Sequence, residues 1–468
     1  MADQPPPSGD SKSGLPVQYD LTQTISSYLD RHMVLLLVEY LEMKEMYPAD
    51  DLLKTKLDVV SRTKMEFTKI QIQKQVLETE NPPDKEEKIK LADEQYNEAK
   101  TCIEKEYKID SATEFIENVV NAGLTDPNVT SEEIFDFKKK NMIDNDNLMW
   151  LFKFAKLAFE IGQYKSSWNS LSAYRILSTD DDTSFLALWG KIAAGINTHE
   201  VSPEDVIADV KELGGIIDRR FQVPMLQQLM QRAWLVNWAL FVYMSKVEYA
   251  QEFVEFVLQD KILNAVQTRC PYILRYVVAA VFVAYDKNRK DLESTLTRVL
   301  QMEKDRYRDP LTEFLRNLFV NYDFEAAHQQ LVECEKVFDV DFFLNIHTEE
   351  VEEDGKKIVK NIYREQFFRN ARKVMFELYC RIHKRIDISL LAKRLHLDEK
   401  DTDKALVKLV RDAPFEGKIN SEKNHLVIAT KYPSIYQKVI DKTKQLYHRT
   451  HGILDAIKRK RQQKEPMD

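Results

Sequence analysis

Apolar residues recur every three or four positions along most of the chain, which predicts amphipathic helices from about Tyr19 onward. Residues 33–38 are apolar without interruption, and this predicts a helix that is buried on most of its sides. The longest apolar run, residues 276–285, lies between Arg275 and Asp286 and is expected to be among the most buried segments. It is much shorter than the ~20 residues that a membrane-spanning helix needs. The pattern therefore predicts a mostly α-helical fold.

Two segments in the middle of the chain, residues 159–171 and 319–331, share one pattern. In each, an aromatic residue ends a helix, a tight turn follows and another aromatic residue begins the next helix. A small residue, Ser167 or Ala327, then allows close packing of the pair. This pattern is typical of tetratricopeptide-like repeats, in which each helical pair buries its face against a neighbour. Residues 146–343 are thus predicted to form stacked pairs, which build either an extended concave binding surface or only a helical core.

The pattern changes between residues 367 and 430. Residues 368–383 and 389–395 predict two helices, and Asp398 is a candidate N-cap for a third. Residues 417–420 and 425–428 predict two short strands around a polar turn. A helix, a helix–turn–helix and a β-ribbon in this order are typical of a winged helix.

A last helix is predicted from residue 435 to residue 464, with one apolar seam along it. The seam residues proposed to contact a partner are Ile435, Val439, Leu446, Ile453, Leu454 and Ile457, with Ile440 alongside. A single seam suits packing in a multi-helix bundle. The seam either folds back on the winged helix of its own chain or joins the tails of partner subunits. For the basic cluster at residues 458–461, contact with RNA, a nuclear address and a solvated tail all remain open.

Composition agrees with a helical fold, because glycine makes up only 11 of 468 residues while 31% of residues are charged and 44% are hydrophobic. Residues 1–14 are polar and lack the apolar stretch of a signal peptide, and residues 1–16 are predicted to be a loose tail. No CxxC pair occurs, which favours a reducing compartment and a cytoplasmic location; the four cysteines are Cys102, Cys270, Cys334 and Cys380.

The charge pattern argues against a nucleic-acid-binding winged helix. The formal net charge is −8, so no basic field covers the whole molecule. Residues 398–412, which include the predicted recognition helix, carry five acidic against four basic side chains. A DNA or RNA duplex would repel such a helix more than attract it. A winged helix that binds protein is the preferred interpretation.

No catalytic, cofactor-binding or metal-binding site is predicted. The sequence contains no phosphate-binding loop, dinucleotide-binding turn, nucleophile elbow or zinc-protease motif. Cys380 with His383 and His448 with His451 are each one helical turn apart, but zinc typically takes four ligands. The acidic run at residues 180–182 is expected to be a solvated turn. The protein is therefore not expected to be an enzyme.

Short stretches along nearly the whole chain support a family resemblance. They are residues 19–22, 29–32, 44–47, 52–58, 188–191, 231–235, 263–276, 309–314, 321–324, 376–383 and 439–444. With the order of helical repeats, winged helix and terminal helix, they resemble the PCI family. Its members are scaffold subunits of the proteasome lid, the COP9 signalosome and translation initiation factor 3, and the initiation factor subunits resemble this chain most.

The resemblance implies a right-handed helical-repeat solenoid, similar to tetratricopeptide or HEAT repeats, that ends in a winged-helix PCI subdomain and a long helix. The divisions expected are a tail at 1–16, helical repeats at 17–241, a PCI domain at 242–430 and a bundle helix with a basic tail at 431–468. Within the PCI domain, a helical part at 242–364 carries an acidic loop at 347–357, and the winged helix spans 365–430.

The function implied is that of a non-catalytic scaffold subunit of translation initiation factor 3. Its partners would be other subunits, reached through winged-helix edges and the helical bundle, and the complex would bind the 40S ribosomal subunit and recruit mRNA. The alternatives are a scaffold of the proteasome lid or the signalosome and, less favoured, a winged-helix regulator that binds nucleic acid.

Overall fold

The computed structural model describes eleven stretches of the chain: residues 17–80, 145–198, 200–285, 296–345, 348–353, 356–383, 385–387, 411, 416–420, 425–429 and 435–462. Backbone packing divides the chain into two compact units, Met1–Ala371 and Arg372–Asp468. The predicted N-terminal tail, the predicted helices at 389–395 and after Asp398, and the turn between the two ribbon strands lie outside the described residues.

Helices make up most of unit 1. The N-terminal elements are η1 (Val17–Tyr19), α1 (Thr22–Ser26), α2 (Arg31–Met43), α3 (Ala49–Ser61) and α4 (Glu66–Glu80). The next five helices are α8 (Asn145–Ile161), α9 (Tyr164–Leu177), α10 (Asp181–Asn197), α11 (Pro203–Arg219) and α12 (Met225–Tyr243).

A second series of shorter helices follows in unit 1. It comprises η2 (Val247–Tyr249), α13 (Ala250–Val257), α14 (Asp260–Arg269), α15 (Ile273–Val283), α17 (Thr297–Met302), α18 (Pro310–Arg316), the π-helical turn η4 (Asn317–Asn321), α19 (Phe324–Val340) and α20 (Phe342–Asn345). All eleven residues of α15 are buried, as its uninterrupted apolar sequence predicts.

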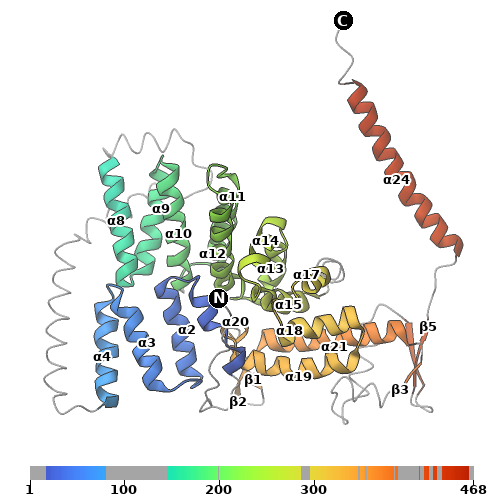
Figure 1. Cartoon of the computed structure of the whole chain (residues 1–468), viewed down its shortest axis with the longest axis horizontal. Helices are drawn as coiled ribbons and strands as arrows, with labels where there is room; N and C mark the ends of the chain where they lie inside the picture. The colour runs from blue at the N-terminus through green and yellow to red at the C-terminus, as the bar shows by residue number, and fades with distance from the viewer. Residues whose placement is uncertain are drawn as a thin grey trace, which may run out of the picture. The chain divides into compact units, whose positions relative to one another are not determined.

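Neighbours in the sequence are also neighbours in space. Helices α8, α9 and α10 lie side by side, and α2, α3 and α4 form a second set that meets them through α2 and α10 (Figure 1). Between α8 and α9, the buried Ser167 hydroxyl donates to the Ala155 carbonyl at 2.8 Å, so the two backbones approach closely. The predicted fold of stacked helical pairs is confirmed.

The repeated pattern at residues 159–171 and 319–331 corresponds to a repeated turn. The first helix of each pair ends at a left-handed residue, Gly162 with φ 98° or Tyr322 with φ 54°, and the second helix begins two residues later. Ser167 and Ala327 are both 0% exposed. The left-handed region suits glycine and costs other residues ~1–2 kcal/mol.

The N-terminal segment returns to helices much later in the chain. The Trp238 indole donates to the Tyr28 carbonyl at 3.0 Å, and the Asn345 amide donates to the Tyr40 hydroxyl at 2.8 Å. Val38 of α2 shares an apolar cluster with Val340 of α19. These contacts place α2 and the turn before it against residues on both sides of the predicted boundary at 241/242.

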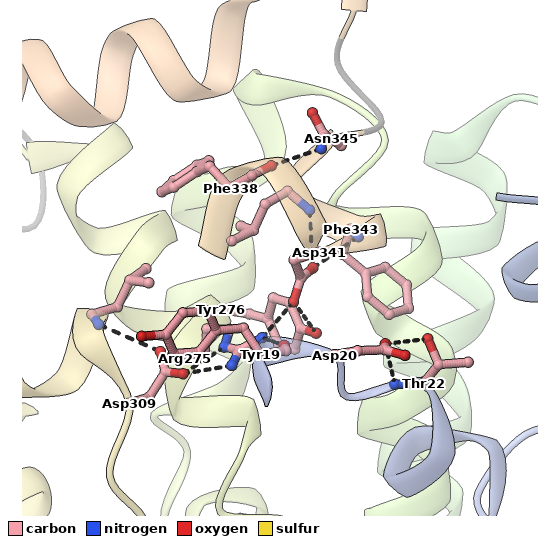
Figure 2. A network of polar contacts seen from close by, with 12 residues as sticks. Tyr19, Asp20, Thr22, Arg275, Tyr276, Asp309, Phe338, Asp341, Phe343 and Asn345 are labelled. Carbon is pink, nitrogen blue, oxygen red and sulfur yellow. Dashed lines mark hydrogen bonds and ion pairs between the residues drawn. The ribbon is translucent and has the colours of Figure 1, made fainter. Parts of the chain in front are cut away.

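A buried arginine joins these segments (Figure 2). The Arg275 guanidinium on α15 donates to Asp309 Oδ1 from Nε at 3.1 Å, to Asp341 Oδ2 at 2.8 Å and to the Tyr19 carbonyl at 2.9 Å. Asp309 is the N-cap of α18, and Asp341 lies between α19 and α20. Tyr276 donates to the same Asp341 oxygen at 2.9 Å.

The charged groups of the arginine network are buried and paired. The Arg275 side chain is 2% exposed, and the two carboxylates are about as buried. Burial lowers the pKa of the Arg275 guanidinium, but its neighbours, Asp309 foremost, together raise it above the ordinary value, so the group stays charged. The other Asp341 oxygen accepts from the backbone N–H groups of Phe343 and Leu344. Each charge in the network therefore has a partner.

The prediction of an acidic loop at residues 347–357 is wrong. Strands β1 (Thr348–Glu353) and β2 (Lys356–Asn361) form an antiparallel hairpin there. Its register sets Glu349 opposite Lys360 and Glu352 opposite Lys357. Residues of opposite charge at directly opposed positions favour strand pairing, so the lysine-rich sequence after residue 355 gives the acidic run a partner.

Unit 2 begins within α21 (Ile362–Ile382), which confirms the helix predicted at 368–383. Strands β4 (Glu416–Asn420) and β5 (His425–Ala429) confirm the predicted ribbon, and a strand that was not predicted, β3 (Arg385–Asp387), pairs with β5. The strand order is β3-β5-β4, with Ile386 and Leu426 opposed and both buried. The last element is α24 (Ile435–Gln462).

The left-handed turn at Gly162 can be tested by substitution. A Cβ at this residue would lie 3.2 Å from Met65 Cε, so Gly162→Ala is expected to lower the free energy of unfolding by about 1–2 kcal/mol. Gly214→Ala within α11 is the control, because its Cβ would only touch Leu235 at 3.5 Å and should stabilise the helix by roughly 0.5–1 kcal/mol. Urea unfolding followed by circular dichroism measures both, and equal effects would contradict the prediction.

The arginine network predicts a large loss of stability for Arg275→Met. The substitution leaves Asp309 and Asp341 buried without their cation, which costs about 3–5 kcal/mol. Arg62→Met is the control, because Arg62 and its partner Asp58 are both 61% exposed, and such pairs contribute about 0–1 kcal/mol. Thermal and urea unfolding compare the two variants. A midpoint for Arg275→Met no lower than that of Arg62→Met would show that the network does not hold the fold.

Candidate assembly surface

Helix α24 carries a continuous apolar face. Face residues recur at intervals of three, one and three positions, so they line one side of the 28-residue helix, roughly 42 Å long. They are Tyr436, Val439, Ile440, Thr443, Leu446, Tyr447, Thr450, Ile453, Leu454 and Ile457. We call this set the α24 face. Ile435 lies at its edge, one residue before Tyr436.

All six residues predicted to contact a partner lie on this face or at its edge, and all are exposed. Their exposed fractions range from 45% for Leu454 to 80% for Ile435. Tyr436, Ile440 and Tyr447 are also more than half exposed. In unit 1, by contrast, all eleven residues of α15 are buried. That the six residues contact a partner remains a prediction.

Two threonines in the middle of the α24 face have satisfied hydroxyl groups. Thr443 Oγ1 donates to the Val439 carbonyl at 2.7 Å, and Thr450 Oγ1 donates to the Leu446 carbonyl at 2.8 Å. A buried hydroxyl without a hydrogen bond is costly, and these bonds remove that cost. The face can therefore be covered along its whole length. The prediction from sequence omitted both threonines because they are not apolar, although their spacing could have identified them.

The three-stranded sheet offers a second candidate surface. Because β5 lies in the centre, β3 and β4 are the outer strands of this sheet. Outer strands present backbone N–H and C=O groups that can pair with another chain. The side chain of Val427 in β5 is 40% exposed, whereas that of its neighbour Leu426 is buried.

The acidic run at residues 180–182 and the pair Cys380 and His383 have structural roles in the fold. Asp180 caps α10 by accepting from the N–H groups of Asp182 and Thr183, and Asp182 pairs with Arg220. Burial raises the pKa of the Cys380 thiol to about 12, which makes it a poor nucleophile. The nearby His383 ring packs against Tyr379 at 4.5 Å between ring centres.

The two histidines of α24, His448 and His451, both lie beside Tyr447. His451 Nε2 lies 2.9 Å from the Tyr447 hydroxyl, and the His448 ring packs near Tyr447. Within the described ranges, no three His, Cys, Asp or Glu side chains are grouped as a metal site would need. Among the helices in those ranges, none combines the length and apolarity needed to cross a bilayer.

An open groove in unit 1 lies between the start of α2, the end of α3 and α8. Its lining mixes Arg31, Arg62, Lys64 and Lys156 with acidic side chains. Lys64 pairs with Glu160 at 3.0 Å. The charges of the groove are thus partly neutralised within the chain, and the α24 face remains the stronger candidate for recognition.

Two family models match the chain. The model described as "eIF3 subunit 6 N terminal domain" matches residues 20–158, and the model described as "PCI domain" matches residues 331–430. The second match includes α21 and strands β1 to β5, which supports the assignment of the three-stranded sheet to a winged helix.

Curated relatives match nearly the whole chain. The E subunit of eukaryotic translation initiation factor 3 from Arabidopsis thaliana is 32% identical over 446 residues, which are 94% of this chain and 96% of the relative. The protein of the same name from Drosophila grimshawi is 33% identical over 451 residues, 96% of this chain and 97% of the relative. That of Yarrowia lipolytica is 30% identical over 449 residues, 94% and 99% of the two chains. The chain therefore belongs to the family of the E subunits of eukaryotic translation initiation factor 3.

Proposed function

We propose that the protein is a non-catalytic scaffold subunit that assembles into translation initiation factor 3 in the cytoplasm. There it supports binding of the complex to the 40S ribosomal subunit and recruitment of mRNA. The similarity to the curated relatives extends over about 95% of the chain and supports the assignment to this complex. The exposed α24 face is the observation that carries the scaffold role.

Each predicted domain would contribute a different part of the scaffold. The helical repeats at 17–241 would form a rigid body together with the helical part of the PCI domain at 242–430. The PCI domain would also supply the winged helix, and residues 431–468 would join the helical bundle. In the winged helix, the outer strands β3 and β4 would pair with the edges of other PCI subunits. The Arg275 network supports a rigid body, because it holds the N-terminal segment to helices of the second domain.

The energetics favour a bound state for α24. Burying one large apolar side chain stabilises a complex by about 1.5–3 kcal/mol, less the entropy of ordering it. Eight of the ten residues of the α24 face are large and apolar. A face of this size offers enough apolar surface for stable association, whereas a helix that remains in water would gain nothing from it.

A scaffold role also agrees with the chemistry of the described residues. The buried charged groups around Arg275 are paired with one another and lie away from solvent. A catalytic group needs access to a substrate and a pKa matched to its task. The buried cysteines with described side chains have raised pKa values instead.

The scaffold proposal predicts that Leu446→Asp with Ile453→Asp releases the chain from its complex. Charges buried without a partner in a packed face are costly, whereas charges in water are not. Co-purification of the tagged chain with other initiation factor 3 subunits should fall by at least about tenfold, since 1.4 kcal/mol already gives that factor. Helix content, measured by circular dichroism, should not change.

The matched control is Gln445→Asp with His448→Asp. Both residues lie on α24 and are exposed, and neither belongs to the α24 face. This variant adds the same charge and should stay in the complex. Equal retention of both variants would contradict assembly through α24. Mass spectrometry of the wild-type sample also separates the proposal from its alternatives, because recovery of proteasome-lid or signalosome subunits instead would contradict the named complex.

A further inference from the structure

Charge is distributed unevenly along the chain. Between Ile435 and Gln462, α24 has eight lysines and arginines against two aspartates, a formal charge of +6. The whole chain carries −8, so the rest of the chain carries −14. Helix α24, with its exposed apolar face, is therefore also strongly basic, and its partner must accommodate both properties.

The cations of α24 border the apolar face. Lys442 and Arg449 each precede a threonine of the face and lie along one edge, seven residues apart. Lys444 and Lys458 each follow a face residue and lie along the other edge. We call these four residues the rim cations. Lys438 lies off both edges, and the side chains of residues 459–461 are outside the described part.

The acidic residues of α24 lie on the other side. Asp441 and Asp455 are fourteen residues apart, each two positions before a face residue, which turns them away from the face. The rim cations are exposed, and they form no ion pair among the described residues. The helix thus presents an apolar face between two basic edges, and its two carboxylates lie on the opposite side.

We propose that the α24 face is covered by one or more acidic amphipathic helices of partner subunits, whose Asp and Glu side chains pair with the rim cations. In helical bundles, residues beside the apolar seam meet charged residues of the neighbouring helix and select partner and orientation. This inference rests on the proposed function and adds the chemistry of the partner.

Other occupants fit the α24 face less well. A second copy of α24 would bring basic edges against basic edges, and like charges at close range repel. RNA would satisfy the cations but would leave the apolar residues between them in contact with phosphates and sugars. The back-bonded hydroxyls of Thr443 and Thr450 also point to an apolar neighbour, because neither hydroxyl needs a partner outside the helix.

The test uses the full chain within its purified complex and a carbodiimide, a reagent that joins a lysine amine directly to a carboxylate with no spacer. Mass spectrometry then identifies the linked residues. Cross-links from Lys442, Lys444 and Lys458 to Asp or Glu in predicted amphipathic helices of other subunits are expected. Cross-links of these lysines only to their own chain, or to no carboxylate at all, would overturn the inference.

A pair of matched variants provides a second readout. Lys442→Gln with Arg449→Gln removes two rim charges, and Gln445→Glu with His448→Glu makes the same change in charge off the face. Retention in the complex is measured as KCl rises from about 0.1 M to about 0.5 M, where screening weakens exposed ion pairs. The rim variant should be retained about three- to tenfold less than the control at low salt, and the difference should disappear at high salt.

The outcomes separate this inference from the proposed function. If Leu446→Asp with Ile453→Asp releases the chain but the rim variant behaves like its control, the acidic partner is wrong and the scaffold role stands. If neither variant releases the chain, assembly through α24 is wrong as well. Release of the wild-type chain by ribonuclease would identify RNA as the occupant and overturn the inference.

Discussion

The fold of unit 1 depends on one buried cation. Arg275 on α15 holds the cap of α18, the junction of α19 and α20, and the backbone of Tyr19, which lies 256 positions earlier in the sequence. A buried charge is tolerated only when its partners are all in place. The N-terminal segment and helices α15, α18, α19 and α20 are therefore held together within unit 1.

Helix α24 differs from unit 1 in leaving its apolar face exposed. Unit 1 has an extensive apolar core of its own, and the buried charges around Arg275 are paired inside the same unit. In α24 the apolar face is exposed, while its threonine hydroxyls are already bonded within the helix. Such a surface is suited to burial against another apolar surface. In the scaffold role proposed above, unit 1 supplies a folded body with its own core, and α24 supplies the surface for partner subunits.

Helix α24 and the rest of the chain also differ in charge. The basic α24 and the acidic remainder give the molecule two kinds of surface, and long-range attraction and repulsion act differently on each. Apolar burial gives affinity but does not distinguish one helix from another. Basic edges beside an apolar face do distinguish them, since a partner with the wrong charge would be rejected even where its shape fits.

The sequence by itself determined the helical fold, the tail helix and its exposed seam, because periodicity and caps act over one or two turns. It also identified the ribbon strands β4 and β5, which follow one another closely. It could not find β3, whose three residues are a strand only because β5 pairs with them, and it gave no sign that Arg275 meets Tyr19. The acidic composition of residues 347–357 predicts a loop, whereas the hairpin at residues 348–361 forms because β1 pairs with the lysine-containing β2 that follows it. Contacts between distant segments depend on how the whole chain packs, and only the tertiary structure decides them.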